Sequence, residues 1–116
     1  MTTDAVGRAL HIKTAIGVIR AGLVGQTLET MQLDALRWAG FERQLEIISE
    51  ASRRIPTDWK SQYGPGIDWP GMAALGNLLR HSYHHANATV LWSIYARDLD
   101  PLEAAIDRML IDHHLT

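Results

Sequence analysis

Hydrophobic residues recur every three or four positions along most of the chain, which is the spacing of one buried helix face. This spacing predicts a first helix from Thr3 to Leu23. Its apolar stripe consists of Ile12, Ile16, Ile19 and Leu23. No segment of useful length alternates apolar and polar residues at the period of two that a strand requires. The pattern therefore predicts an all-α fold.

Capping residues set the borders of the next two elements. Thr27 suits the N-cap of a short turn that leads to Leu33. Asp34 suits the N-cap of a second long helix, which runs to Ile55 and is stopped by Pro56. Its apolar residues again keep a three- and four-residue spacing: Trp38, Phe41, Leu45, Ile48 and Ile55. Such a seam is typical of an antiparallel helical bundle.

A turn-forming stretch separates the second long helix from the third. A short helical turn is expected from Thr57 to about Gln62, followed by Tyr63-Gly64-Pro65-Gly66, which no helix would cross. Asp68 is then the expected N-cap of a third long helix that ends near His81–Tyr83. The two halves on either side of the break are each too small to be a domain alone.

The remaining sequence predicts two more helices. Asn87 suits the N-cap of a helix from Ala88 to Asp98, and Asp100-Pro101 suits the start of the last one. The last helix is expected to face inward with Leu102, Ala105, Ile106, Met109 and Leu110. We therefore expect residues 1–116 to form a single domain, an up-and-down bundle of four long helices with short extra turns.

Composition narrows the possible functions. The 116 residues are 47% hydrophobic and 21% charged, which suits one folded domain. Cysteine is absent, so disulfides, thiolate zinc sites and a cysteine nucleophile are excluded, and a cytoplasmic location is expected. No signal peptide and no membrane-spanning run is recognised. The formal charge is -2, whereas a protein that binds nucleic acid mainly by neutralising phosphates is normally basic. If the substrate is RNA, it is therefore expected to bind locally, in a cleft, and not on a broad basic face.

The residues best suited to chemistry lie at the end of the third helix. Five of the six histidines fall in segments 81–85 and 113–114, and the first segment adjoins Arg80 and includes Tyr83. A histidine can donate or accept a proton near neutral pH, and a guanidinium can hold a phosphate or stabilise developing negative charge. RNA cleavage by its own 2′-hydroxyl needs a base, an acid and a charge stabiliser, with no metal or other cofactor.

Two other interpretations of the histidines stay open. A histidine near a helix end is often a capping or solvated residue. His81 and His85 are one turn apart, as zinc ligands often are, but a third ligand from Asp112–His114 would require the last helix to fold back onto the third. The pair at 113–114 is more simply a frayed polar tail that favours the helix dipole.

Segments along nearly the whole chain resemble the HepT-like (DUF86) proteins. The stretch 67–83, followed by 87–92, is similar to their signature, in which a Pro/Asp-Trp entry leads to an Arg-x4-His-x-Tyr motif. Upstream, residues 43–52 resemble the family's Leu-Glu-Ile-Ile-Gly-Glu-Ala segment, with Ser49 in place of the glycine. Residues 99–102 match the family's Leu-Pro-x-Leu turn in outline.

The resemblance implies an all-α homodimer that acts as a ribonuclease toxin. It also implies an antitoxin partner, an MntA-like minimal nucleotidyltransferase, which neutralises the toxin by transferring AMP to the motif tyrosine. Carried over by position, His81 is the catalytic histidine, and Tyr83 is the site-forming tyrosine that is modified. Asn77, the polar residue after the motif arginine, and His84 are the expected substrate-binding residues.

The chain departs from the family motif at one position, where Gly76 replaces the arginine. Arg80 lies one turn later on the same helix face, about 6 Å away, and we hypothesise that it substitutes for the missing arginine. The competing hypothesis is a catalytically degenerate subunit that docks on a nucleotidyltransferase as its substrate-binding partner. On a continuous helix His81 and Tyr83 point about 200° apart. They can share a pocket only if the helix unwinds near Ser82 or if a second subunit supplies one of them.

Overall fold

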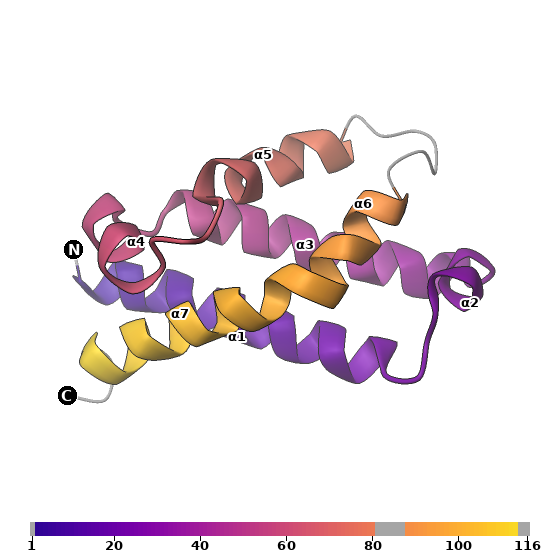
Figure 1. The fold of residues 1–116 in the computed structure, drawn as a ribbon, viewed down its shortest axis with the longest axis horizontal. Coiled ribbons are helices and arrows are strands. Elements are labelled where there is room, and N and C mark those ends of the chain that lie inside the picture. Colours follow the sequence, from indigo (N-terminus) through magenta and orange to yellow (C-terminus); the bar gives the residue numbers. More distant parts are fainter. Residues whose placement is uncertain (1, 81–87, 114–116) are drawn as a thin grey trace.

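All the regular structure in the computed structural model, which describes residues 2–80 and 88–113, is helical (Figure 1). The expected all-α bundle is thereby confirmed. None of the helices in these ranges is long and apolar enough to span a lipid bilayer. The elements in chain order are α1 (Thr2–Leu23), α2 (Leu28–Gln32), α3 (Ala35–Arg53), α4 (Thr57–Tyr63), α5 (Trp69–Arg80), α6 (Ala88–Ser93), the π-helical η2 (Ile94–Asp98) and α7 (Leu99–His113).

The body of the bundle is built on α1, which packs against both α3 and α7, while α5 packs against α3 (Figure 1). The short α4 lies beside α7. Buried side chains from these helices form one connected hydrophobic core. The apolar stripes expected in the first two long helices all belong to it: Ile12, Ile16, Ile19, Leu23, Trp38, Phe41, Leu45, Ile48 and Ile55.

The last two expected helices form one continuous rod, so the predicted break at Asp100-Pro101 is wrong. Between α6 and α7 the backbone widens into η2, where the N–H of Leu99 donates to the carbonyl of Ile94. In a regular α-helix Leu91 and Leu99 would point about 80° apart. The wider turn lets both side chains reach the core, with exposed fractions of 2% and 0%. It also accommodates Pro101, whose nitrogen has no hydrogen to donate to an earlier carbonyl.

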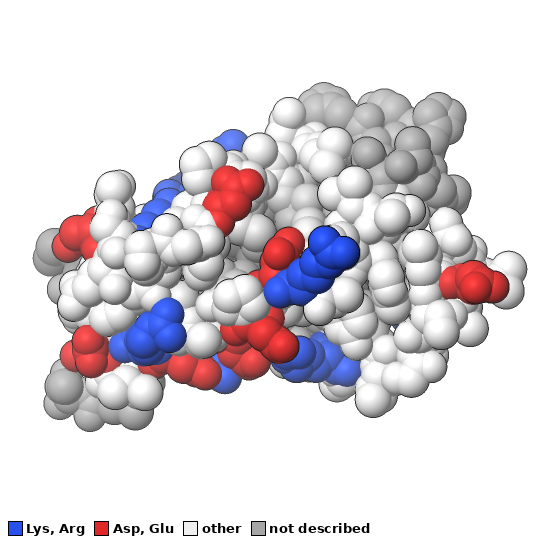
Figure 2. Space-filling view, in the orientation of Figure 1, with Lys and Arg blue, Asp and Glu red and all other residues white. Residues whose placement is uncertain are grey.

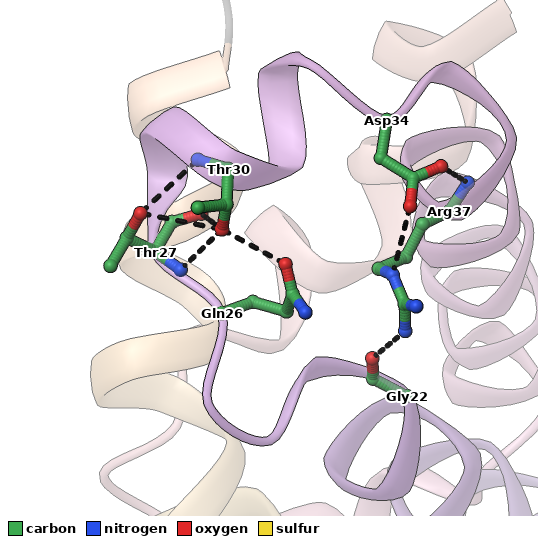
Figure 3. A network of polar contacts seen from close by, with 6 residues as sticks. All are labelled: Gly22, Gln26, Thr27, Thr30, Asp34 and Arg37. Carbon is green, nitrogen blue, oxygen red and sulfur yellow. Dashed lines mark hydrogen bonds and ion pairs between the residues drawn. The ribbon is translucent and has the colours of Figure 1, made fainter.

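Polar side chains brace the connection from α1 to α3 (Figure 3). Thr27 caps α2 as expected: its hydroxyl accepts the N–H of Thr30 at 3.1 Å, and the Thr30 hydroxyl accepts the N–H of Thr27 at 2.9 Å. The Arg37 guanidinium donates to the carbonyl of Gly22 and to the carboxylate of Asp34. These bonds tie the end of α1 to the beginning of α3.

Asp34 caps α3 as predicted, and its contribution to stability should depend on pH. The backbone N–H of Arg37 and then its side chain hold the pKa of the Asp34 carboxyl below its ordinary value. The charged carboxylate therefore stabilises the folded state above the usual pKa of about 4, and this stabilisation is lost as the pH falls through the lowered pKa.

We expect Asp34→Ala to lower the midpoint of thermal unfolding at pH 7, and we expect its difference from the unaltered protein to shrink in acid. Thermal unfolding followed by circular dichroism between pH 2 and pH 7 measures both. Asp34→Asn is the matched control, because asparagine keeps a capping oxygen without the charge. A difference that stays constant over this range would show that the carboxylate's charge contributes nothing.

Candidate functional site

The end of α5 that carries the candidate residues is interlocked with α3 through a serine and a glycine. The Ser49 hydroxyl donates to the carbonyl of Ala73 at 3.0 Å and accepts the N–H of Gly76 at 2.8 Å. Ser49 is only 1% exposed, and Gly76 is buried as well. A Cβ atom on residue 76 would lie 3.1 Å from the Ser49 hydroxyl oxygen. Residue 76 therefore faces α3, at a point where the two helices are in close contact.

The Arg80 side chain folds back along α5 toward this crossing. Its Nη1 atom lies 3.4 Å from the place where a Cβ atom on Gly76 would be. A side chain on residue 76 would thus enter space next to the guanidinium of Arg80. The Arg80 guanidinium is thus close to Gly76, while its replacement of the motif arginine and its catalytic role stay predictions.

We expect Gly76→Ala to lower the free energy of unfolding by about 1 kcal/mol, although alanine favours a helix over glycine by a similar amount. The new methyl group would press on a buried hydroxyl that two hydrogen bonds hold in place, and overpacking of this kind costs about 1–3 kcal/mol. Urea unfolding gives the value. In a Ser49→Ala background, where no hydroxyl is in the way, the same change should be neutral or stabilising. Equal effects in the two backgrounds would rule out this explanation.

Asn77, the expected substrate-binding residue, lines a groove of about 730 Å³ between α5 and the α6–η2–α7 rod. The groove is mainly apolar, and its charged residues are Asp68 and Asp98. Arg80 is not among the residues that line it, so the structure does not bring Arg80 and Asn77 together in one pocket. The other candidates, in segment 81–85, lie outside the described residues.

A third polar side chain, from Arg53, reaches the same crossing of α3 and α5. Its Nε atom donates to the carbonyl of Ala73 at 3.2 Å. The carbonyl of Ala73 thus accepts hydrogen bonds from both the Ser49 hydroxyl and the Arg53 side chain. Sequence reasoning missed Arg53, since its one signal is a spacing of four residues from Ser49, which places both side chains on one helix face.

His113 is packed against α4, so the expectation of a frayed polar tail at this residue is wrong. Its ring stacks on Trp59 with centroids 4.1 Å apart, and its Nε2 atom lies 2.9 Å from the Tyr63 hydroxyl. That hydroxyl donates to Asp112 at 2.8 Å, and burial, followed by the Asp112 carboxylate, raises the pKa of Tyr63. The flat faces of the two rings explain the packing, since stacking removes apolar surface from water.

The zinc interpretation gains no support from the described residues. The end of α7 lies beside α4, at the end of the bundle away from the beginning of α6 (Figure 1). No group of three or more potential metal ligands occurs in ranges 2–80 and 88–113.

Charges of both signs are mixed over the face shown in Figure 2. Between α1 and α7, Lys13 lies 3.0 Å from Glu103 and 2.9 Å from Asp107. Arg20 lies 2.6 Å from Asp100. Cations that already face carboxylates in this way contribute little to neutralising phosphates. The surface between these helices is therefore a poor candidate for binding RNA.

Comparison with known proteins points to one family. A family model described as "Ribonuclease HepT-like" matches residues 12–109. The "Probable ribonuclease HepT" of Thermococcus cleftensis is 37% identical over 67 residues, which are 58% of this chain and 60% of that protein. The "Putative RNase MJ1380" of Methanocaldococcus jannaschii is 35% identical over 65 residues, or 56% of this chain and 59% of that protein.

The aligned regions leave part of each protein uncovered. The chain spans about 60% of the length of these two curated relatives. A longer match, to the "Putative RNase TTE0752" of Caldanaerobacter subterraneus subsp. tengcongensis, covers 74% of this chain and 76% of that protein at 26% identity. No solved structure matches the chain.

Proposed function

The chain belongs to the ribonuclease HepT-like family, and on this premise we propose that it is a metal-independent ribonuclease. The observation that carries the proposal is the position of Arg80. Its guanidinium lies against Gly76, where the family motif has its arginine, and it directly precedes His81. The names of the relatives, all given as ribonucleases, agree with this activity.

The proposed reaction is attack on the phosphodiester by the neighbouring 2′-hydroxyl of the RNA. The 2′-oxygen forms a bond to phosphorus while the bond from phosphorus to the 5′-oxygen breaks. A base takes the 2′-hydroxyl proton and an acid supplies a proton to the leaving 5′-oxygen, so the products are a 2′,3′-cyclic phosphate and a 5′-hydroxyl. His81 handles one of these two protons.

Arg80 and Tyr83 complete the proposed site. The guanidinium of Arg80 offsets the extra negative charge that the phosphate gains in the transition state. Tyr83 holds the phosphate in position, and Asn77 and His84 bind the flanking RNA. The proposed active form of the protein is a homodimer. The roles of His81, Tyr83 and His84 rest on the family motif, since residues 81–87 lie outside the described ranges.

We further propose that the protein is the toxin of a two-gene toxin–antitoxin pair. Its partner would be a minimal nucleotidyltransferase that transfers AMP to the hydroxyl of Tyr83, with release of pyrophosphate from ATP. A bulky adenylate on a residue of the site would prevent the phosphodiester from entering. The alternative function is a helical subunit without catalytic activity that docks on the transferase, and the loss of the motif arginine at Gly76 favours it.

Expression of the chain alone separates the two functions. The toxin proposal predicts growth arrest and RNA degradation, both relieved when a cognate nucleotidyltransferase is expressed together with the chain. Mass spectrometry of the co-expressed protein should find one adenylate per chain, and none on Tyr83→Phe. Normal growth, together with a stable complex of chain and transferase and intact RNA, would instead establish the docking subunit.

A further inference from the structure

Two arginines from different helices approach the same turn of α5, and we propose that they bind one phosphate together. The pair consists of Arg53 from α3 and Arg80 from α5. We infer that their guanidinium groups hold a single phosphodiester of the RNA at the α3–α5 crossing. This inference rests on the proposed ribonuclease function and adds to it a substrate-binding residue from outside the motif segment.

The geometry of the crossing brings the two side chains to the same turn of α5. Arg53 Nε and the Ser49 hydroxyl both donate to the carbonyl of Ala73, at 3.2 Å and 3.0 Å. The same hydroxyl accepts the N–H of Gly76, and Arg80 Nη1 lies 3.4 Å from the Cβ position of that glycine. Each guanidinium therefore approaches a residue that is hydrogen-bonded to the Ser49 hydroxyl, Arg53 at Ala73 and Arg80 at Gly76.

The charges at this point are unbalanced. Within ranges 2–80 and 88–113, no carboxylate lies at ion-pair distance from either member of the pair. Other arginines of α3 and its C-cap do have such partners: Arg43 lies 3.8 Å from Glu46, and Arg54 lies 3.6 Å from Glu50. Two cations held near each other repel, and an anion that contacts both would turn this repulsion into attraction. Both side chains are exposed, so an anion can reach them from solvent.

A phosphodiester is the anion that this arrangement fits. A guanidinium is planar and offers parallel N–H groups that match two phosphate oxygens, and it keeps its charge at any pH at which RNA is stable. The hydrogen bond from Nε of Arg53 to Ala73 fixes that side chain before RNA arrives, and so lowers the entropy lost on binding. Because Arg80 is also the proposed stabiliser of transition-state charge, we take the phosphodiester held here to be the one that is cleaved.

Binding of an RNA that cannot be cleaved tests the pair. The probe is a fluorescent, single-stranded 2′-O-methyl RNA, followed by anisotropy at several salt concentrations. Arg53→Gln should weaken binding about tenfold with little change in the slope of log K against log salt, because Arg80 still contacts the phosphate. Replacement of both arginines should reduce the slope by about 0.7, the value for one phosphate contact on a single strand. Arg54→Gln is the matched control, since Arg54 is exposed on the next residue but faces Glu50.

Two further variants address the shared phosphate. Arg53→Lys keeps the charge without the planar fork, so we expect an intermediate loss of affinity with the full salt slope. Arg80→Gln should resemble Arg53→Gln, and the double variant should lose less affinity than the product of the two single losses, because both arginines contact one phosphate. A thermal melt of each variant excludes unfolding, and local loosening alone would not lower the salt slope of the double variant.

The outcomes distinguish this inference from the function it rests on. If the unaltered protein binds and cleaves RNA while Arg53→Gln behaves like Arg54→Gln in affinity and slope, the arginine pair is wrong and the ribonuclease proposal stands. If the unaltered protein binds no RNA at any salt concentration, both are overturned. Losses at Arg53 and Arg80 that multiply fully would show two separate phosphates, which contradicts a shared one.

Discussion

Replacement of Arg80 by alanine is expected to lower the rate constant of RNA cleavage by about 100- to 1,000-fold, the usual effect of removing one group that stabilises transition-state charge. The Arg80 guanidinium lies 3.4 Å from the place where a Cβ atom on Gly76 would be, and no other motif position supplies an arginine. The measurement is single-turnover cleavage of a labelled RNA oligonucleotide. Arg80→Lys should retain part of the activity, because it keeps the charge but not the fork.

Two further variants test whether a loss of activity is specific to Arg80. Arg54→Ala removes an exposed arginine that faces Glu50 and should leave cleavage unchanged. In an Arg80→Ala background, Gly76→Arg combined with Ser49→Gly should restore much of the lost rate, because the second change removes the hydroxyl that a Cβ on residue 76 would meet at 3.1 Å. Full activity of Arg80→Ala would refute the substitution hypothesis.

Replacement of His81 by alanine should cost on the order of 10²–10⁴ in rate, the range typical of a general acid or base. It should also abolish growth arrest on expression. If His81 is the base, the unaltered protein should lose activity as the pH falls and the imidazole becomes protonated. If His81 is the acid, activity should fall as the pH rises. His81→Ala should not show this pH dependence. Rates measured from pH 5 to pH 9 give both results.

The control for His81 is another histidine of the same chain. His11 is exposed on α1, and His11→Ala should retain both the rate and the pH profile. If His81→Ala cleaves RNA with an unchanged profile, the proton transfer belongs to another residue. If both variants and the unaltered protein are inactive, the alternative function as a docking subunit is favoured.

Most of the fold could be predicted from local sequence. Helix borders follow from side chains that hydrogen-bond to nearby backbone groups, and Thr27, Asp34 and Asp68 all act as the expected caps. The apolar stripes follow from helical periodicity alone. Both signals lie within a few residues of the feature that they predict, so no knowledge of tertiary contacts is needed.

The two predictions about the fold that were wrong concern features that depend on tertiary packing. Asp100-Pro101 has the composition of a helix start, yet burial of Leu91 and Leu99 favours a continuous rod with a π-helical turn. His113 looks like a polar end residue, and only the return of α7 to α4 provides Trp59 for it to stack on. In both cases the energy gained by packing outweighs a weak local preference.

Only part of the candidate site could be predicted from the sequence. Ser49 and Gly76, the two departures from the resembled motifs, are 27 residues apart, yet a hydrogen bond of 2.8 Å joins them. The serine hydroxyl is near the Cβ position of residue 76, so a larger side chain there would be crowded. Two changes that looked independent therefore form one contact, and neither the contact nor the arrival of Arg53 beside it could be read from spacing along the chain.

We propose that this chain cleaves RNA with no metal ion, by attack of the RNA's own 2′-hydroxyl on the neighbouring phosphodiester. The most direct measurement is end-group analysis of RNA cut by the purified protein in excess EDTA. We expect 2′,3′-cyclic phosphate and 5′-hydroxyl ends, and no cut where the 2′-hydroxyl is replaced by hydrogen. Intact RNA, or cleavage that leaves 5′-phosphates and disappears with EDTA, would contradict it.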